Sequence, residues 1–310
     1  MNSVLVTGGA GFIGSHLCEA LLAKGSKVVC IDNFVTGKEK NVEHLLPDKN
    51  FLLVEEDIVD AIDVEGKFSR VYNLASPASP ADFPKIPVEI LLANSLGTKN
   101  ALDFAAKNKA RLLEASTSEV YGQPLEHPQK ETYFGNVNPV GPRACYDESK
   151  RFAEALVMAY GRKKFLDTRI ARIFNTYGQR MRADDGRVIP NFITQALQKK
   201  PITVYGRGKQ TRSFCFVTDL VEGLIKLMES DYSMPVNLGN PTEDTILHIA
   251  EEIKRLAGSE SKIVFSGLPE DDPERRKPDI SVAKKQLGWQ PKISFEEGIL
   301  KTIQFFKKEI

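Results

Sequence analysis

Tyr146 and Lys150 are the first residues whose types and spacing suggest chemistry. They stand four residues apart in the stretch Tyr146-Asp-Glu-Ser-Lys150, and on a helix this spacing places both side chains on one face. The phenol is a poor base at neutral pH because its reference pKa is about 10. A neighbouring ammonium stabilises the phenolate and lowers that pKa. The pair therefore predicts a general base, and chance placement on a helix is the alternative.

A second candidate segment lies upstream, Ser116-Thr-Ser-Glu-Val-Tyr-Gly122. It supplies Thr117, Ser118 and Glu119, two hydroxyl groups and a carboxyl group that can bind or move protons. Metal chemistry is not expected, because the four cysteines contain no CxxC spacing and the four histidines share no ligand spacing. The cysteines are instead interpreted as reduced thiols.

A glycine-rich turn, Gly8-Gly-Ala-Gly-Phe-Ile-Gly14, follows a strand-like run and opens a helical pattern. Its glycines permit a tight turn, close approach of the backbone to a pyrophosphate, and close packing of helix against strand. The amino terminus of the helix then faces the phosphates with its partial positive charge. We therefore predict a dinucleotide site. A purely structural turn is the alternative, since a glycine pattern alone has little specificity.

Asp32 ends the second predicted strand, where an acid that binds the adenosine ribose belongs. Its charge would repel a 2′-phosphate, so NAD is favoured over NADP, although the nearby Lys38 weakens that preference. Asp57 and Ile58 are candidates for an adenine contact, and a solvated acidic turn is the alternative there. The predicted cofactor-binding residues are Gly8, Gly11, Phe12, Ile13, Gly14, Asp32, Asn33, Lys38, Asp57, Ile58, Leu74, Ala75, Tyr146 and Lys150.

The elements that must position these residues alternate between strands and helices in the first half. Such alternation predicts an α/β fold, a Rossmann-type doubly wound parallel sheet covered on both faces. The second half is less regular and predicts a smaller substrate-binding lobe. We expect an NAD-binding domain over 1–174 and a nucleotide-sugar lobe over 175–310, with a soft, discontinuous boundary. Strands are expected at 4–6, 27–31, 51–54, 71–75, 111–115, 168–173, 202–205 and 236–238, and helices at 15–24, 94–108, 191–199, 219–229, 246–257 and 295–306.

The composition is that of an ordinary globular protein, with 42% hydrophobic and 27% charged residues. A formal net charge of +1 gives no reason to expect nucleic acid or a membrane surface as partner. The chain enters a strand-like run almost directly after Met1, and no apolar run approaches the ~18 residues that span a bilayer. A cytoplasmic enzyme is therefore expected.

Taken together, these motifs resemble the extended short-chain dehydrogenases/reductases, the NAD-dependent epimerases and dehydratases of nucleotide sugars. Among them the chain is most similar to the UDP-glucuronate decarboxylase family, and the resemblance covers nearly the whole chain. Two residues depart from that pattern: Ser149 stands where glycine is expected, and Gln179 where proline is expected. The similar segments are Asp32-Asn-Phe34, Ser76-Pro-Ala-Ser-Pro80, Asn138-Pro-Val-Gly-Pro-Arg-Ala-Cys-Tyr146, Arg172-Ile-Phe-Asn-Thr-Tyr-Gly178, Gln210-Thr-Arg-Ser-Phe214 and Arg275-Arg-Lys-Pro-Asp279.

The resemblance implies that Tyr146 removes the proton from the sugar O4 while a hydride leaves C4 for NAD+, and that Thr117 binds the same oxygen. The resulting 4-ketone is a β-keto acid that loses CO2 and then regains the hydride. Ser118 stands where dehydratases carry an aspartic acid, so elimination of water is disfavoured. Glu119 is expected near the reacting carbons, where it orients substrate or manages a proton through water; a structural Glu119 is the alternative.

The same resemblance places Arg276 at the sugar carboxylate and assigns Arg212 and Asn175 to the nucleotide diphosphate, where a fork of donors suits phosphate oxygens. Arg180 is a weaker candidate of the same kind. Pro77 is expected to line the crevice within its Ser-Pro loop, or simply to stiffen that loop. A homodimer is expected from the family, formed by the helices around 94–108 and 148–161.

Three other functions stay open. A nucleotide-sugar 4-epimerase needs the same Tyr146, Lys150 and NAD but no arginine at a sugar carboxylate, and a 4,6-dehydratase needs an acid in place of Ser118. A catalytically silent NAD(P)-sensing protein on this fold has no need for the base. The expected reaction is conversion of UDP-glucuronate to UDP-xylose and CO2.

Overall fold

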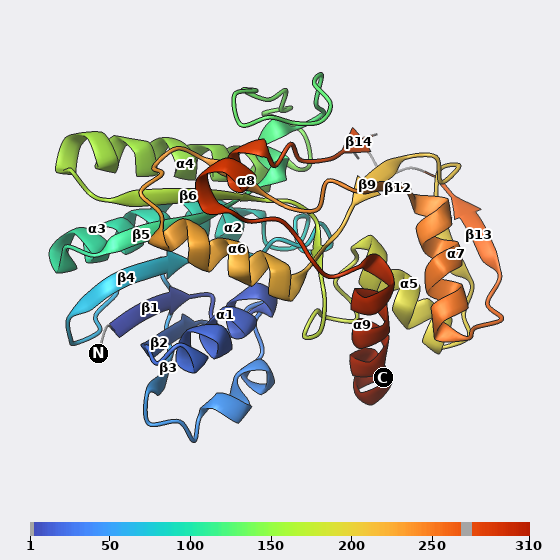
Figure 1. The fold of residues 1–310 in the computed structure, drawn as a ribbon, viewed down its shortest axis with the longest axis horizontal. Helices are drawn as coiled ribbons and strands as arrows, with labels where there is room; N and C mark the ends of the chain where they lie inside the picture. Colours follow the sequence, from blue (N-terminus) through green and yellow to red (C-terminus); the bar gives the residue numbers. More distant parts are fainter. Residues whose placement is uncertain (1–2, 268–274) are drawn as a thin grey trace.

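The centre of the molecule is a seven-stranded parallel sheet (Figure 1), which confirms the predicted fold class. The computed structural model describes residues 3–267 and 275–310. The strand order is β11-β6-β5-β4-β1-β2-β3, so the direction of strand progression reverses between β1 and β4. The strands are β1 (Ser3–Thr7), β2 (Lys27–Asp32), β3 (Phe51–Glu55), β4 (Phe68–Asn73), β5 (Arg111–Thr117), β6 (Thr168–Ile173) and β11 (Val236–Leu238).

Alternating side chains of each strand divide the core between the two faces of the sheet. On β1, Val4 and Val6 point into one apolar cluster and Leu5 into the other. The first face is covered by α1 (Phe12–Ala23), α6 (Val217–Glu229) and α8 (Ser281–Leu287). The opposite face is covered by α2 (Pro87–Leu92), the π-helical turn η3 (Ala93–Gly97), α3 (Thr98–Asn108) and α4 (Ala144–Lys164).

A smaller lobe lies beside the carboxyl edge of the sheet, at the right of Figure 1. Its helices α5, α7 and α9 pack on one another around two small sheets, β8–β13 and β12–β9–β14. Its elements, with the pair β7–β10, are α5 (Val188–Leu197), α7 (Ile246–Ala257), α9 (Phe295–Glu309), β7 (Thr176–Tyr177), β8 (Ile202–Tyr205), β9 (Thr211–Ser213), β10 (Cys215–Phe216), β12 (Glu243–Thr245), β13 (Ile263–Ser266) and β14 (Arg275–Arg276). The short 3-10 turns are η1 (Glu39–Asn41), η2 (Glu43–Leu45) and η4 (Ser118–Tyr121).

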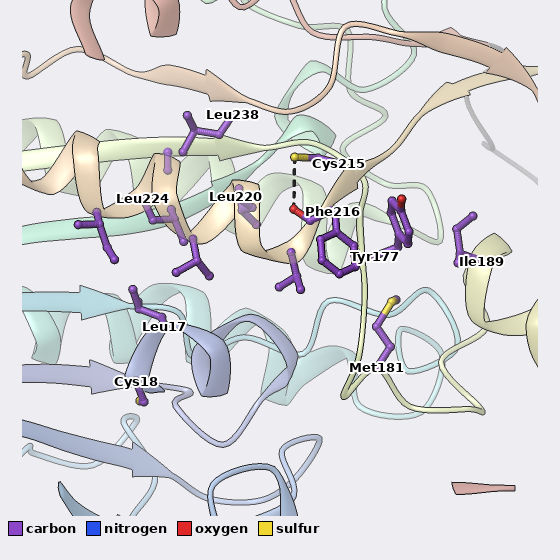
Figure 2. Close-up of a cluster of buried hydrophobic side chains, with 14 of the residues drawn as sticks. Leu17, Cys18, Tyr177, Met181, Ile189, Cys215, Phe216, Leu220, Leu224 and Leu238 are labelled. Carbon is purple, nitrogen blue, oxygen red and sulfur yellow. Dashed lines mark hydrogen bonds between the residues drawn. The ribbon is translucent and has the colours of Figure 1, made fainter. Parts of the chain in front are cut away.

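One apolar cluster runs without interruption from the sheet into the lobe (Figure 2). Leu17 of α1 and Leu220 of α6 belong to it, as do Tyr177, Met181 and Ile189 near the lobe. All five side chains are buried, and burying each contributes roughly 1.5–3 kcal/mol. This shared core fixes the lobe against the sheet. The strand β11, from the second half of the chain, also completes the sheet beside β6.

The predicted strands and long helices are present within four residues of their expected bounds, apart from the stretch 94–108, where α3 is preceded by the turn η3. The strands β7, β9, β10, β12, β13 and β14 were not predicted; all but β13 have only two or three residues, which carry no periodic pattern. The four cysteines are unpaired. Within the described residues no helix is long and apolar enough to cross a membrane.

Candidate active site

A cavity of about 360 Å³ opens between the carboxyl ends of the central strands and the lobe. In open α/β sheets a ligand crevice forms where the strand order reverses, which here is between β1 and β4. The cavity collects residues from segments far apart in the sequence. The predicted site residues that line it are Gly8, Gly11, Phe12, Ile13, Gly14, Leu74, Thr117, Ser118, Glu119, Tyr146, Lys150, Asn175, Arg180, Arg212 and Arg276.

The glycine turn forms the dinucleotide side of this cavity. Gly8 has a φ of +66° and a Cβ there would overlap the backbone of Ala75, so only glycine suits the position. A Cβ at Gly14 would overlap the carbonyl oxygen of Gly8. The amino terminus of α1 has no side-chain cap, which leaves its first N–H groups for an anion. This cradle matches a pyrophosphate.

Asp32 lies buried beside the glycine turn. Its Oδ2 accepts the Ala10 N–H and its Oδ1 the Phe34 N–H, both at 2.9 Å. Burial raises the pKa of the carboxyl group, and the backbone N–H groups oppose that rise. Its position at the end of β2 is the one expected of a ribose-binding acid, but Asp32 is outside the set of cavity-lining residues. The assignment to the ribose stays a prediction.

Six other predicted residues also fall outside the cavity lining. Asn33 and Lys38 are exposed, and Asn33 donates to Asp57 at 2.9 Å. Ile58 is buried in the core cluster that covers the α3 face of the sheet. Ala75 and Pro77 are half-buried, and their neighbours Leu74, Ser76 and Ala78 line the cavity instead.

Tyr146 lies on the cavity wall in the first turn of α4 and is buried. Its ring stacks on Phe83, with centroids 5.2 Å apart and an interplanar angle of 22°. Burial raises the pKa of the phenol, and a hydrogen bond with the Thr117 side chain opposes that rise. Thr117 and Tyr146, each expected to contact the sugar O4, therefore lie side by side in the folded chain, and their role toward a sugar stays a prediction. Before it acts as a base, the phenol needs a cation to stabilise its charged form.

Lys150, one turn further along α4, is also buried. Its ammonium donates to the Glu114 carboxylate at 3.2 Å and to the Ala115 carbonyl at 2.8 Å. The buried carboxylate of Glu114 is a feature that the sequence reasoning missed, because it stands in a stretch interpreted only as an apolar strand. The sequence signal for it is a single charged residue within an otherwise apolar strand, because a buried charge requires a partner.

Glu119 lies between two arginines that the sequence separates widely. Arg143 donates to it at 2.6 Å, and Arg276 lies 3.4 Å from the same oxygen. Burial disfavours the charged form, but Arg276 and Arg143 outweigh it and hold the pKa of Glu119 down to about 2. Glu119 is therefore an anion at neutral pH and no proton donor.

Arg276 is buried at the cavity wall on β14, in register with Arg212 of β9. Its guanidinium also donates to the carbonyl oxygens of Ser118 and of Gly122, the latter at 3.0 Å. An Arg-Arg-Lys run is also typical of a solvated basic turn. The structure buries Arg276 and leaves its neighbour Arg275 exposed.

Arg143 and Asp147 are charged residues to which the sequence reasoning assigned no role. The guanidinium carbon of Arg143 lies over the Phe83 ring, 5.6 Å from its centroid, and Arg143 lines the cavity. Asp147 follows Tyr146, and burial raises its pKa to about 7. The weaker candidate Arg180 points toward α1, where it donates to Glu19 at 2.7 Å.

A glycine-turn cradle beside a buried Tyr–Thr pair on a seven-stranded parallel sheet defines the class, that of the NAD-dependent epimerases and dehydratases. A family model described as GDP-mannose 4,6 dehydratase matches residues 5–302. The solved UDP-glucose 4-epimerase of Thermotoga maritima superposes with a TM-score of 0.91 at 28% identity, covering 99% of both chains. The UDP-glucuronic acid 4-epimerase of Bacillus cereus, solved with UDP-glucuronic acid and NAD, gives a TM-score of 0.89 at 29% identity, covering 99% of this chain and 100% of that one.

Curated relatives narrow the class to one family. The UDP-glucuronic acid decarboxylase 1 of Danio rerio is 53% identical over 307 residues, which cover 99% of this chain and 73% of the relative. The protein of the same name from Arabidopsis thaliana is also 53% identical, over 99% of this chain and 70% of the relative. The chain belongs to the UDP-glucuronic acid decarboxylase family.

Proposed function

We propose that the protein converts UDP-glucuronate to UDP-xylose and CO2, with NAD as a bound cofactor. The observation that carries the proposal is the charge at the cavity wall. Two arginines, Arg276 and Arg143, flank one carboxylate, Glu119, and the cavity lining holds seven arginine and lysine side chains against three carboxyl groups. A sugar that carries a carboxylate needs such a charge, since an unpaired anion in a closed pocket is costly. The family membership agrees with this substrate.

NAD, when bound, would accept the hydride from C4 of the sugar and later return it, so the net reaction needs no external oxidant. The glycine turn fits its pyrophosphate, because it lines the cavity and leads into the uncapped amino terminus of α1, whose first N–H groups can bind an anion. Asp32 would accept the adenosine ribose hydroxyls and disfavour a 2′-phosphate. The Bacillus cereus epimerase binds NAD together with UDP-glucuronic acid, which supports the same pairing of cofactor and substrate here.

The proton chemistry follows from the buried phenol. Tyr146, as phenolate, would take the O4 proton as the hydride leaves C4, while Thr117 holds the same oxygen. The C5–C6 bond of the β-keto acid then breaks, CO2 leaves with C6, and the electron pair forms an enolate on the C4 oxygen. Protonation of C5 by solvent water, return of the hydride to C4 and return of the O4 proton from Tyr146 would complete the cycle. Arg276 would steady the carboxylate and then the enolate.

Two features weigh against the dehydratase alternative. Ser118, at the position of the dehydratase acid, has a hydroxyl group, which is a poor proton donor for a departing hydroxide. Glu119 is ionised beside its two arginines and cannot donate either. A 4-epimerase shares the tyrosine and the fold of this chain, and the high similarity to solved epimerases keeps it as the second candidate.

The deciding experiment incubates the purified protein with NAD+ and, separately, with UDP-glucuronate and UDP-glucose. Labelled CO2 from the uronate carboxyl group and UDP-xylose by chromatography support the proposal. Absorbance at 340 nm shows whether the 4-keto sugar leaves and NADH accumulates. Interconversion of UDP-glucose and UDP-galactose, without CO2 from UDP-glucuronate, would decide for the epimerase.

We further propose a homodimer formed by α2, η3, α3 and α4. Large apolar side chains stay exposed on α2, η3 and α4: Val88, Leu91, Leu92, Leu96 and Phe152. Contiguous exposed apolar surface of this kind marks interaction sites. Light scattering should give twice the chain mass, and Leu92→Glu with Phe152→Glu should give the monomer. A cytoplasmic location is proposed as well, since unpaired cysteines are typical of reducing compartments.

A further inference from the structure

A buried polar chain crosses three neighbouring strands beneath the active site. Thr7 of β1, Asn73 of β4 and Glu114 of β5 are in register across the sheet, and each is at most 1% exposed. Thr7 Oγ1 donates to Asn73 Oδ1 at 2.6 Å, and Asn73 Nδ2 donates to Glu114 Oε2 at 2.6 Å. The other carboxylate oxygen, Oε1, accepts from Lys150 at 3.2 Å. The chain of hydrogen bonds therefore ends on the active-site ammonium.

Glu114 occupies a position that stability alone would give to an apolar residue. Strands of a parallel sheet buried on both faces are near-continuous apolar runs, and Leu112 and Leu113 on the same strand follow that rule. Replacing a buried ion pair by well-packed apolar residues is often neutral or stabilising. A fully satisfied carboxylate at this place therefore indicates a role in the chemistry of its partner, Lys150.

We propose that Glu114 is a positioning residue of the active site. It pairs with the Lys150 ammonium and holds it at the carboxyl end of β5, on the wall of the cavity that Tyr146 also lines. The inference rests on the proposed function, in which Tyr146 and Lys150 act together. Two of the three N–H donors of Lys150 are directed at Glu114 and at the Ala115 carbonyl, so the orientation of the ammonium is fixed by β5.

Glu114 is the carboxylate that faces the Lys150 ammonium, at 3.2 Å. Asn73 of β4, Thr7 of β1 and Thr98 of α3 complete the network as neutral side chains. On α4 itself, Tyr146 precedes Lys150 by one turn. Glu154 follows by one turn, where it pairs with Arg172 of β6 at 2.7 Å.

Removing the Glu114 carboxylate should destabilise the charged form of the neighbouring ammonium. Loss of an anion 3.2 Å away disfavours the charged amine in a buried site. Lys150 in Glu114→Gln should therefore lose its proton at a lower pH than in the natural chain. In the pH profile of kcat/KM, the alkaline limb should move down by about one pH unit or more, a tenfold change in the ionisation constant.

The test compares Glu114→Gln, Glu114→Leu and Glu114→Asp across pH 6–10 with UDP-glucuronate. The Gln and Leu variants should both show the lowered alkaline limb, although Leu suits a strand interior. The Asp variant keeps the charge and should stay close to the natural profile. Glu154→Gln is the matched control: it removes a carboxylate from the same interface, but its partner Arg172 does not titrate, so the limb should not move.

A second readout needs no catalysis. In Glu114→Gln the buried ammonium has lost its anionic partner, so the folded variant should bind protons less tightly than its unfolded chain. The stability deficit of that variant against the natural chain should then be largest near pH 7 and shrink toward pH 10. For Glu154→Gln the deficit should not change with pH. Superimposable alkaline limbs in all variants, with a pH-independent deficit for Glu114→Gln, would overturn the proposal. Absence of CO2 release by the natural chain would instead count against the proposed function.

Discussion

Arg276→Ala is the substitution that best separates a substrate role from a structural one. Arg276 is 1% exposed and donates to the carbonyls of Ser118 and Gly122 while facing Glu119. Truncation leaves these buried acceptors without their charged donor. Breaking a buried pair of this kind costs about 3–5 kcal/mol of unfolding free energy, so a loss of stability is expected whatever the function.

The functional loss has to be measured separately from that stability cost. If Arg276 binds the sugar carboxylate, kcat/KM for UDP-glucuronate should fall at least roughly thirtyfold. This corresponds to a loss of ~2 kcal/mol of transition-state stabilisation, the scale of a lost buried charge contact. The affinity for UDP alone should change less than about twofold, because Arg212 and Asn175 are assigned to the diphosphate. The assays are release of labelled CO2 and calorimetric titration with UDP, both well below the melting temperature of the variant.

Arg169→Ala is the matched control for a buried arginine that holds backbone carbonyls. Arg169 is also 1% exposed and donates to the Ser230 carbonyl at 2.9 Å and the Thr168 carbonyl at 2.7 Å, and it is outside the set of cavity-lining residues. Its loss should lower stability with kcat/KM unchanged. An equal fall in UDP affinity for Arg276→Ala would move that side chain to the phosphates. Unchanged kcat/KM in Arg276→Ala would refute the carboxylate assignment.

Three other residues can each be tested by one substitution. Tyr146→Phe should reduce turnover at least ~10³-fold with NAD binding intact, because the phenol supplies the base; turnover near the natural rate would contradict the mechanism. Asp32→Ala should weaken NAD binding and relax discrimination against NADP, as measured by titration with both cofactors; unchanged affinities would remove Asp32 from the ribose site. Asp147 has its pKa raised by burial to about 7, above about 3.9 in the unfolded chain, so its folded form holds the extra proton and stability falls as pH rises through that window. Asp147→Asn should therefore gain on the order of 4 kcal/mol relative to the natural chain between pH 4 and pH 8, by urea unfolding at both values; a constant difference would show that Asp147 does not titrate there.

The sequence by itself determined the parts of this protein that depend on neighbours along the chain. The apolar runs of β1 to β6 and the glycine turn after β1 were predicted because strand periodicity and turn chemistry are local. The Tyr146–Lys150 spacing belongs to one helix for the same reason. The strands β7, β9 and β14 escaped prediction because two or three residues pair only where another segment meets them.

The tertiary structure decided the charges of the site. Glu119 and Arg276 are 157 residues apart, yet they meet at 3.4 Å, and this contact, together with Arg143, keeps Glu119 an anion despite its burial. Likewise Arg180 turns to Glu19 on α1, and Lys150 turns to Glu114 on β5. Ionisation and hydrogen-bond partners depend on burial and on distances between separate elements. A one-dimensional pattern names the residue types available to a site, whereas the fold sets which of them are charged and what they face.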